Sequence, residues 1–146
     1  MRLVVQRVSR ASVRVGDDIV GEIGRGAVVL VGIGRGDDAG AVDRMADKLL
    51  GLRYFEDAAG RTNLAIADVG GACLVVSQFT LLADTRRGRR PGFTDAAPPE
   101  LAAPLVERLA ERLRGAGIEV ATGRFGAAMA VELVNDGPFT LVLDAE

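Results

Sequence analysis

Histidine is absent from the 146 residues of this chain, and its absence excludes several kinds of active site. A Ser-His-Asp triad, a Cys-His dyad and an HExxH zinc site each need an imidazole. The single cysteine, Cys73, forms no internal disulfide and no CxxC metal site. The single lysine, Lys48, leaves one possible base for a Ser-Lys dyad. We therefore expect a site with no metal, no cofactor and no nucleophile activated by an imidazole.

A long apolar run is also missing. No stretch approaches the roughly 18 residues that a membrane-spanning helix needs. The N-terminal segment is interrupted by Gln6, Arg7 and Arg10, which argues against a signal peptide. The 18 basic and 20 acidic residues give a net charge of −2, so the chain is not basic as a whole. We expect a soluble, cytoplasmic protein with no membrane partner, and a single cysteine agrees with a reducing compartment.

Apolar residues make up 49% of the chain, which is enough for one substantial core. The length suits a single domain, and we find no internal repeat, linker or low-complexity tract. Continuous apolar runs at residues 27–31 and 72–76 indicate strands that are buried on both faces. Strands are predicted at residues 3–8, 11–15, 19–20, 27–31, 72–81, 118–121, 130–134 and 139–143, with loops at 57–63 and 83–98.

Two helices are predicted. The first runs from about residue 38 to residue 52, with an apolar stripe in an i, i+3, i+4, i+7 pattern and an aspartate at 37 or 38 as its cap. The second opens at Pro98-Pro99, repeats leucine every four residues from 101 to 113, and stops at Gly115 and Gly117. The sum is an α+β domain that spans residues 1–146, with two helices on a strand-rich body.

Polar side chains follow the second buried strand, in the segment Ser-Gln-Phe-Thr at residues 77–80. The end of a strand that leads into a loop is a common active-site position, because a rigid element aims a mobile one. A Ser or Thr nucleophile needs a base at neutral pH, and Lys48 lies opposite the apolar stripe of its helix, where we expect solvent. The segment therefore favours donors that hold a substrate and stabilise an oxyanion. The alternative is a strand edge whose polar groups are satisfied within the fold.

A second candidate segment is Asn-Asp-Gly-Pro-Phe-Thr at residues 135–140. All of its first four residues are turn formers, so the plainer interpretation is a turn between two strands. Gly137 would also let the backbone approach a ligand closely. The Gly137–Pro138 bond could be cis, as about 5–6% of bonds before proline are.

A third segment carries four arginines within five residues, in the long stretch without periodicity. Arginines in a loop bind phosphates through two hydrogen bonds, and this is a local positive patch in a nearly neutral chain. The alternative is a solvated charged loop, since one loop is weaker evidence for nucleic-acid binding than a basic face. The candidate phosphate contacts are Arg86, Arg87, Arg89 and Arg90.

Together these segments resemble the D-aminoacyl-tRNA deacylase family, also called D-tyrosyl-tRNA deacylases. The SQFT and NxGP signatures, in this order and spacing, are highly specific to that family. A modest departure is Ala128, where some relatives carry an acidic residue, and it affects only the surface near Met129. The resemblance runs from end to end of the chain and rests on residues 6–8, 11–13, 77–81, 123–125 with 129, and 135–138.

The resemblance implies a single α+β domain with barrel-like, strand-rich sheets and two main helices. It implies a homodimer with active sites at the subunit interface. Charged tRNA would be the substrate, and the ester between a D-amino acid and the terminal adenosine would be cleaved. Glycine mischarged onto alanine tRNA would also be removed. The ribose 2′-hydroxyl would assist, which fits a chain without histidine.

The resemblance also assigns roles to residues. The catalytic pocket motif would be Ser77, Gln78, Phe79 and Thr80. The Gly-cisPro motif would be Gly137 and Pro138, with a cis bond whose two carbonyls reach into the partner's active site and exclude L-amino acids. The pocket for the terminal adenosine would be lined by Phe125 and Met129.

Two other functions compete with this one. The arginine-rich segment would serve a non-catalytic nucleic-acid-binding protein equally well. A generic ester hydrolase could use Thr80 as its nucleophile. Ester release from charged tRNA, without release from small-molecule esters, separates all three.

Overall fold

The computed structural model describes residues 1–145, and within them it has a six-stranded sheet, a two-stranded hairpin and two α-helices. The helices are α1 (Ala39–Gly51) and α2 (Pro99–Gly115), with short 3₁₀ helices η1 (Ala67–Val69) and η2 (Phe79–Leu82). The strands are β1 (Arg2–Val15), β2 (Asp18–Ile23), β3 (Gly26–Gly32), β4 (Arg53–Glu56), β5 (Thr62–Ala65), β6 (Ala72–Ser77), β7 (Glu119–Thr122) and β8 (Ala130–Asp144).

The large sheet has the order β2-β1-β3-β6-β7, and β8 pairs with β1. β1 is long enough to serve two partners in turn. Its first half pairs antiparallel with β3, its second half pairs antiparallel with β2, and β8 runs antiparallel along both halves. β3, β6 and β7 are parallel neighbours, connected through the helical segments.

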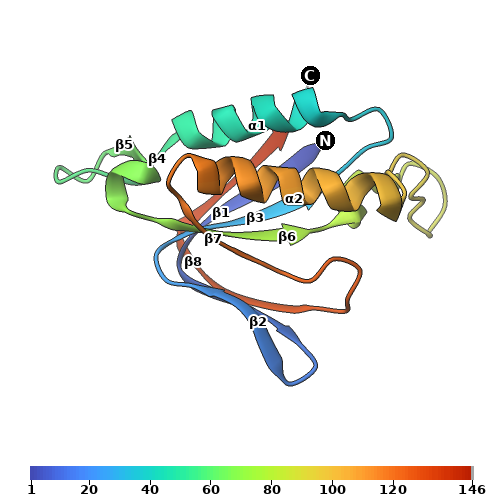
Figure 1. The fold of residues 1–146 in the computed structure, drawn as a ribbon, viewed down its shortest axis with the longest axis horizontal. Coiled ribbons are helices and arrows are strands. Elements are labelled where there is room, and N and C mark those ends of the chain that lie inside the picture. Colours follow the sequence, from blue (N-terminus) through green and yellow to red (C-terminus); the bar gives the residue numbers. More distant parts are fainter. Residues whose placement is uncertain (146) are drawn as a thin grey trace.

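The helices lie side by side over one face of this sheet, while the β1–β2 hairpin and the start of β8 curl below it (Figure 1). The main core fills the space under the helices, and a second cluster around Val13, Val28 and Leu74 fills the space inside the curl. The two edges of the sheet meet at Gly21 in β2, where an added Cβ would lie 2.5 Å from the Thr122 carbonyl oxygen of β7. The result is a nearly closed, barrel-like sheet, which confirms the predicted fold class.

Both predicted helices form, and their apolar stripes are buried against the sheet. Asp38 caps α1 by accepting a hydrogen bond from the Ala41 amide at 2.8 Å. Lys48 is exposed, as its place opposite the stripe predicts. One leucine of the four-residue repeat in α2, Leu101, is 37% exposed. A spacing of four drifts by about 40° per step around a helix of 3.6 residues per turn, so Ala102 takes the buried position instead.

Two elements differ from the predictions in the middle of the chain. The loop predicted at 57–63 is shorter, because β4 and β5 form a hairpin around a turn in which Asp57 accepts hydrogen bonds from the Ala59 and Arg61 amides. The strand predicted to continue to residue 81 ends at Ser77. Beyond that residue neither β3 nor β7 extends far enough to pair with it, so the chain turns into η2.

The C-terminal strands also differ. The sequence pattern predicts two strands, at residues 130–134 and 139–143, joined by a turn, but the chain does not reverse between them. Both segments pair with β1 in the same direction and form the single strand β8. The register shifts because Gln6 faces Thr140 and Val8 faces Asn135, so residues 136–139 bulge out opposite Arg7.

Candidate active site

An apolar cavity of about 340 Å³ lies where β6 ends, between α2 and the end of the sheet. Ser77 and Phe79 enter it from β6 and η2, Ala102 and Val106 from α2, and Phe125 from the loop after β7. A smaller hollow of about 70 Å³ adjoins it and shares Ser77, Val106 and Phe125. The cavity is therefore assembled from segments far apart in the sequence, and its lining contains no ionisable side chain.

Three aromatic rings stand at the mouth of this cavity, and they are unusually exposed for their type. Phe79 is 56%, Phe93 38% and Phe125 40% exposed. Phe79 and Phe93 pack edge to face, with ring centroids 5.1 Å apart. Exposed rings around an apolar hollow suit a planar or apolar ligand that stacks on them.

The segment 77–80 leaves the sheet as a tight turn. The Gln78 amide donates to the Val31 carbonyl at 2.7 Å, which holds the start of the turn against β3. The Gln78 side-chain amide donates to the Thr80 hydroxyl, and the Thr80 side chain is exposed. The site thus offers hydroxyls, a carboxamide and backbone N–H groups beside an apolar cavity, but no side-chain base.

The bulge at residues 136–139 is organised by Arg7, a residue for which the sequence suggested no role beyond the resemblance. The Arg7 side chain is only 6% exposed. Its Nε donates to the Asp136 carbonyl at 3.1 Å, and a terminal nitrogen donates to the Tyr54 carbonyl at 2.8 Å. Its guanidinium lies 4.8 Å from the centre of the Phe139 ring. Arg7 alternates in phase with Leu3 and Val5, so the period-two pattern of β1 could have indicated an inward arginine.

Asn135 supports the bulge from its other side, because its side-chain amide donates to the carbonyls of Arg7 at 2.8 Å and Phe139 at 2.9 Å. Gly137 has φ +131°, a conformation that L side chains rarely adopt, and an added Cβ would lie 2.9 Å from an Arg7 nitrogen. The Gly137–Pro138 peptide bond is cis. Both residues are exposed, and neither lines the cavity beside Ser77 in the same chain.

Phe125 and Met129 occupy different environments. Phe125 lines the cavity and the adjoining hollow. Met129 is half-buried and packs over Gly123 beside Val76, as part of the second core cluster rather than of the cavity lining. One chain therefore brings Phe125, but not Met129, to the cavity itself.

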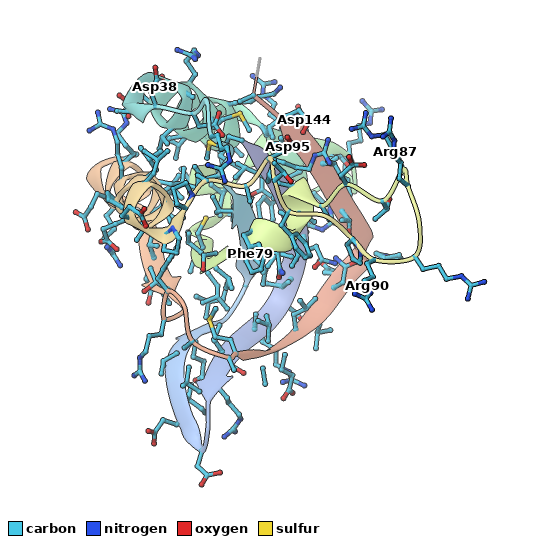
Figure 2. The ribbon with its side chains drawn as sticks, turned by 90° about the vertical axis from the view of Figure 1, so that its right-hand side faces the viewer. Asp38, Phe79, Arg87, Arg90, Asp95 and Asp144 are labelled. Carbon is cyan, nitrogen blue, oxygen red and sulfur yellow. The ribbon has the colours of Figure 1, made fainter. Side chains whose placement is uncertain are left out.

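The arginine-rich segment forms a loop, called here the arginine loop (residues 85–91). Asp84 and Gly92 close its neck through two backbone hydrogen bonds of 2.7 and 2.8 Å. Arg86 folds back on Asp84 in a two-pronged ion pair, and this pairing holds the pKa of the Asp84 carboxyl well below its usual range. Arg87, Arg89 and Arg90 are exposed, and Figure 2 shows Arg87 and Arg90 on the projecting loop.

Residues 1–145 contain neither a membrane-spanning helix nor a cluster of metal ligands. Neither α-helix in this range is long and apolar enough to cross a bilayer. In the same range, no three His, Cys, Asp or Glu side chains gather where they could hold a metal ion.

Solved structures share this fold over nearly the whole chain. A protein described as "c-Myc DNA Unwinding Element Binding Protein" aligns with a TM-score of 0.93 and 40% identity, covering 100% of this chain and 99% of its own. A "probable eukaryotic D-amino acid tRNA deacylase" aligns with a TM-score of 0.86 and 20% identity over 97% of each chain. The class of protein is thus a single-domain, barrel-like α+β fold.

Sequence comparison then gives the family. Residues 4–144 match the family model described as D-Tyr-tRNA(Tyr) deacylase. A D-aminoacyl-tRNA deacylase of Roseiflexus sp. (strain RS-1) is 61% identical over 99% of this chain and 94% of its own length. One from Symbiobacterium thermophilum is 59% identical over 100% and 97%. The chain belongs to the D-Tyr-tRNA(Tyr) deacylase family, a family of hydrolases.

Proposed function

We propose that this protein is an editing hydrolase that cleaves the ester joining a D-amino acid to the 3′-terminal adenosine of tRNA. The family match and the near full-length identity to deacylases support the substrate class. The structural observation that carries the proposal is the apolar cavity beside residues 77–80, which has donors at its edge and no ionisable lining. Such an enzyme would act where aminoacyl-tRNA is used, in the cytoplasm.

Because the cavity lining contains no side-chain base, the proton transfer is assigned to a group of the substrate. Water attacks the ester carbonyl carbon, the bond to the ribose 3′-oxygen breaks, and that oxygen leaves as a hydroxyl. We propose that the neighbouring ribose 2′-hydroxyl relays the proton from the water to the leaving oxygen. The backbone N–H groups and polar side chains of Ser77, Gln78 and Thr80 would hold the carbonyl and stabilise its developing charge. Phe79 and Phe125 would pack against the substrate's apolar parts, and Met129 would support the adenosine pocket from beneath.

Selection for D-amino acids would come from a second copy of the chain. Gly137 and Pro138 are exposed and lie outside the cavity of their own subunit, which is what a segment donated to a partner requires. In a homodimer with active sites at the interface, their carbonyls would occupy the space that an L side chain enters. Glycine and D-residues carry only hydrogen there, so glycine mischarged onto alanine tRNA would also be a substrate.

The decisive experiment follows deacylation of D-Tyr-tRNA, L-Tyr-tRNA and Gly-tRNA(Ala) by the purified protein. We expect rapid release from the D and glycyl substrates and little release from the L substrate. Equal turnover of D- and L-Tyr-tRNA would contradict the proposal.

A second candidate function is binding to DNA without catalysis. The 40% identical structure is that of a protein named for binding a DNA unwinding element, and the arginine loop would suit any phosphate backbone. A protein of that kind would bind DNA tightly and leave every charged tRNA intact.

A further inference from the structure

The four arginines of the arginine loop are not equivalent, although the sequence presents them as one cluster. Arg86 already has a carboxylate partner within the chain. Its Nε and a terminal nitrogen donate to the two Asp84 carboxylate oxygens at 2.8 and 2.7 Å, and its backbone amide donates to the same carboxylate at 3.0 Å. Hydrogen bonding to Asp84, with a smaller contribution from the Asp95 carboxylate, raises the pKa of the Arg86 guanidinium.

Arg86 also faces a different part of the surface from the cavity. It lines an open hollow of about 490 Å³ together with Asp84, Asp95 and Asp144. Arg2 also lines this hollow and pairs with Asp144 at 2.7 Å, so its arginines and carboxylates largely compensate one another. A phosphate that approached Arg86 there would meet like charge on Asp84 and Asp95, so this hollow attracts a polyanion less than an unpaired arginine does.

Arg87, Arg89 and Arg90 differ from Arg86 in their partners, not in their exposure. All four side chains are exposed, Arg86 by 83%, but within residues 1–145 those of Arg87, Arg89 and Arg90 make no ion pair or hydrogen bond. Gly88, at φ +69°, lets the chain turn between Arg87 and Arg89. Three uncompensated cations on one short loop form a local positive patch, although the protein has a net charge of −2.

The neck of the loop lies beside the cavity. Gly92 closes the neck, and the next residue, Phe93, packs on Phe79 at the mouth of the cavity. The other side of the neck, Asp84, lies two residues after η2, which begins at Phe79. Figure 2 shows Phe79 and, on the loop to one side of it, Arg87 and Arg90. A nucleic acid whose end enters the cavity would have this loop within reach.

We propose that Arg87, Arg89 and Arg90 contact the phosphates of the tRNA 3′ end and acceptor stem, whereas Arg86 makes no phosphate contact and stays paired with Asp84. This inference rests on the proposed function, because it takes the terminal adenosine in the cavity as its starting point. The loop would then make three phosphate contacts instead of four and keep one internal ion pair.

Binding of uncharged tRNA(Tyr) at several salt concentrations tests the division. Each of Arg87→Ala, Arg89→Ala and Arg90→Ala should flatten the slope of log affinity against log salt by about 0.7 to 0.9 units, the value of one lost phosphate contact. Arg86→Ala should leave the slope unchanged. Arg61→Ala is the matched control, an exposed arginine on the β4–β5 hairpin at the far end of the molecule (Figure 1).

A truncated substrate separates this inference from the proposed function. D-tyrosyl-adenosine carries the ester and the terminal nucleoside but no phosphate. For each of the three variants, kcat/KM on D-Tyr-tRNA divided by kcat/KM on D-tyrosyl-adenosine should fall several-fold, while Arg86→Ala and Arg61→Ala keep the wild-type ratio. Wild-type protein that cleaves neither substrate would refute the proposed function.

Three outcomes would overturn the inference while the proposed function stands. One is an active enzyme in which Arg86→Ala flattens the slope as much as the other three variants. Another is an unchanged slope and ratio in all of them. The third is binding of a duplex DNA of acceptor-stem length as tight as that of tRNA, lost in the same three variants.

Discussion

Arg7 illustrates how one buried side chain can fix a segment far away in the sequence. Its guanidinium joins the backbone of the bulge in β8 to the backbone of β4 through the carbonyls of Asp136 and Tyr54. The Asp136 carboxylate lies 3.5 Å from Arg7 Nε but is 58% exposed, so the carbonyls contribute more than the ion pair does. Arg7 thereby sets the position of Gly137 and Pro138.

We predict that Arg7→Ala lowers the free energy of unfolding by about 2–4 kcal/mol, because it removes the donor to the buried Tyr54 carbonyl and to the partly buried Asp136 carbonyl. Deacylation should also fall, since residues 136–139 lose their anchor. Asp136→Asn is the matched control and should cost less than about 1 kcal/mol, because the exposed carboxylate is a minor partner. Urea unfolding of the three proteins measures both effects, and an equal loss in the two variants would contradict the role given to the carbonyls.

Thr80 is the side chain that could replace the substrate's 2′-hydroxyl in catalysis by acting as a nucleophile, because it is exposed next to the cavity. It accepts a hydrogen bond from the Gln78 side chain, and the cavity lining offers no base to deprotonate it. We predict that Thr80→Ala keeps substantial deacylase activity. Replacing the terminal ribose of the tRNA by its 2′-deoxy form should remove most of it. A trapped acyl ester on Thr80, seen by mass spectrometry, would instead make Thr80 the nucleophile.

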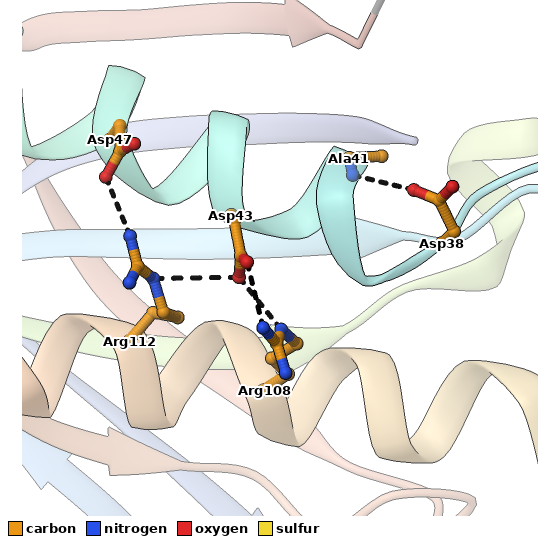
Figure 3. Close-up of polar contacts among 6 residues, drawn as sticks. All are labelled: Asp38, Ala41, Asp43, Asp47, Arg108 and Arg112. Atoms are coloured by element: carbon orange, nitrogen blue, oxygen red, sulfur yellow. Dashed lines mark hydrogen bonds and ion pairs between the residues drawn. The ribbon is translucent and has the colours of Figure 1, made fainter.

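The two helices α1 and α2 both bury their apolar faces against the sheet, and ion pairs link them to each other on their solvent-facing sides. Asp43 of α1 accepts two hydrogen bonds of 2.8 Å from Arg108 of α2, and Arg112 bridges Asp43 and Asp47 (Figure 3). Hydrogen bonding to the Arg108 guanidinium holds the pKa of the Asp43 carboxyl below its usual range. These pairs lie near solvent, so salt weakens them.

This pairing predicts a pH dependence of stability. A carboxyl whose pKa is lower in the folded state stabilises the fold above its unfolded pKa of about 3.9, and the contribution is lost as pH falls through the folded value. The difference in unfolding free energy between wild type and Asp43→Asn should therefore be constant above about pH 5 and shrink below pH 4. Arg108→Gln should remove the same dependence from the other side. Chemical denaturation between pH 2 and 6 measures it, and a difference that stays flat across that range would contradict the assignment.

Across the molecule as a whole, the two signature segments lie apart in one chain. The cavity is built by β3, β6, α2 and the loop after β7, while Gly137 and Pro138 belong to the bulge of β8 and are exposed. The proposed homodimer would bring the segment of one copy to the cavity of the other. A symmetric dimer would then contain two identical composite sites.

Mixing two inactive variants tests this arrangement. Ser77→Phe fills the cavity of its own chain, and Gly137→Val disrupts the bulge, where φ is +131° and an added Cβ meets Arg7. Each variant alone should be nearly inactive. After joint unfolding and refolding, half of the dimers are mixed and each has one intact site, so about one quarter of wild-type activity should return.

A matched control mixes each variant with itself under the same refolding protocol, which should restore nothing. Light scattering on the same samples gives the oligomeric state. A mixture of dimers that stays inactive, or a fully active monomer, would contradict a site shared between subunits.

Features that depend on local pattern and on composition follow directly from the amino-acid sequence. The buried stripes of α1 and α2 follow from side-chain spacing, and the runs at residues 27–31 and 72–76 predict the central strands β3 and β6. The missing histidine excludes an imidazole base whatever the fold. The two signature segments and the family resemblance also lie in short stretches of sequence, and the family comparison confirms that resemblance.

Features that depend on distant neighbours follow only from the packed molecule. β6 ends at Ser77 because β3 and β7 provide no further pairing, and residues 130–144 form one strand because β1 is long enough to pair with both halves. Arg86 differs from Arg87 because the closed neck of the loop places the Asp84 carboxylate within its reach. The cavity draws its lining from residues 31 to 126, so no local pattern specifies it. Pairing and packing between distant segments determine these features, and the periodicity of a single segment contains no information about them.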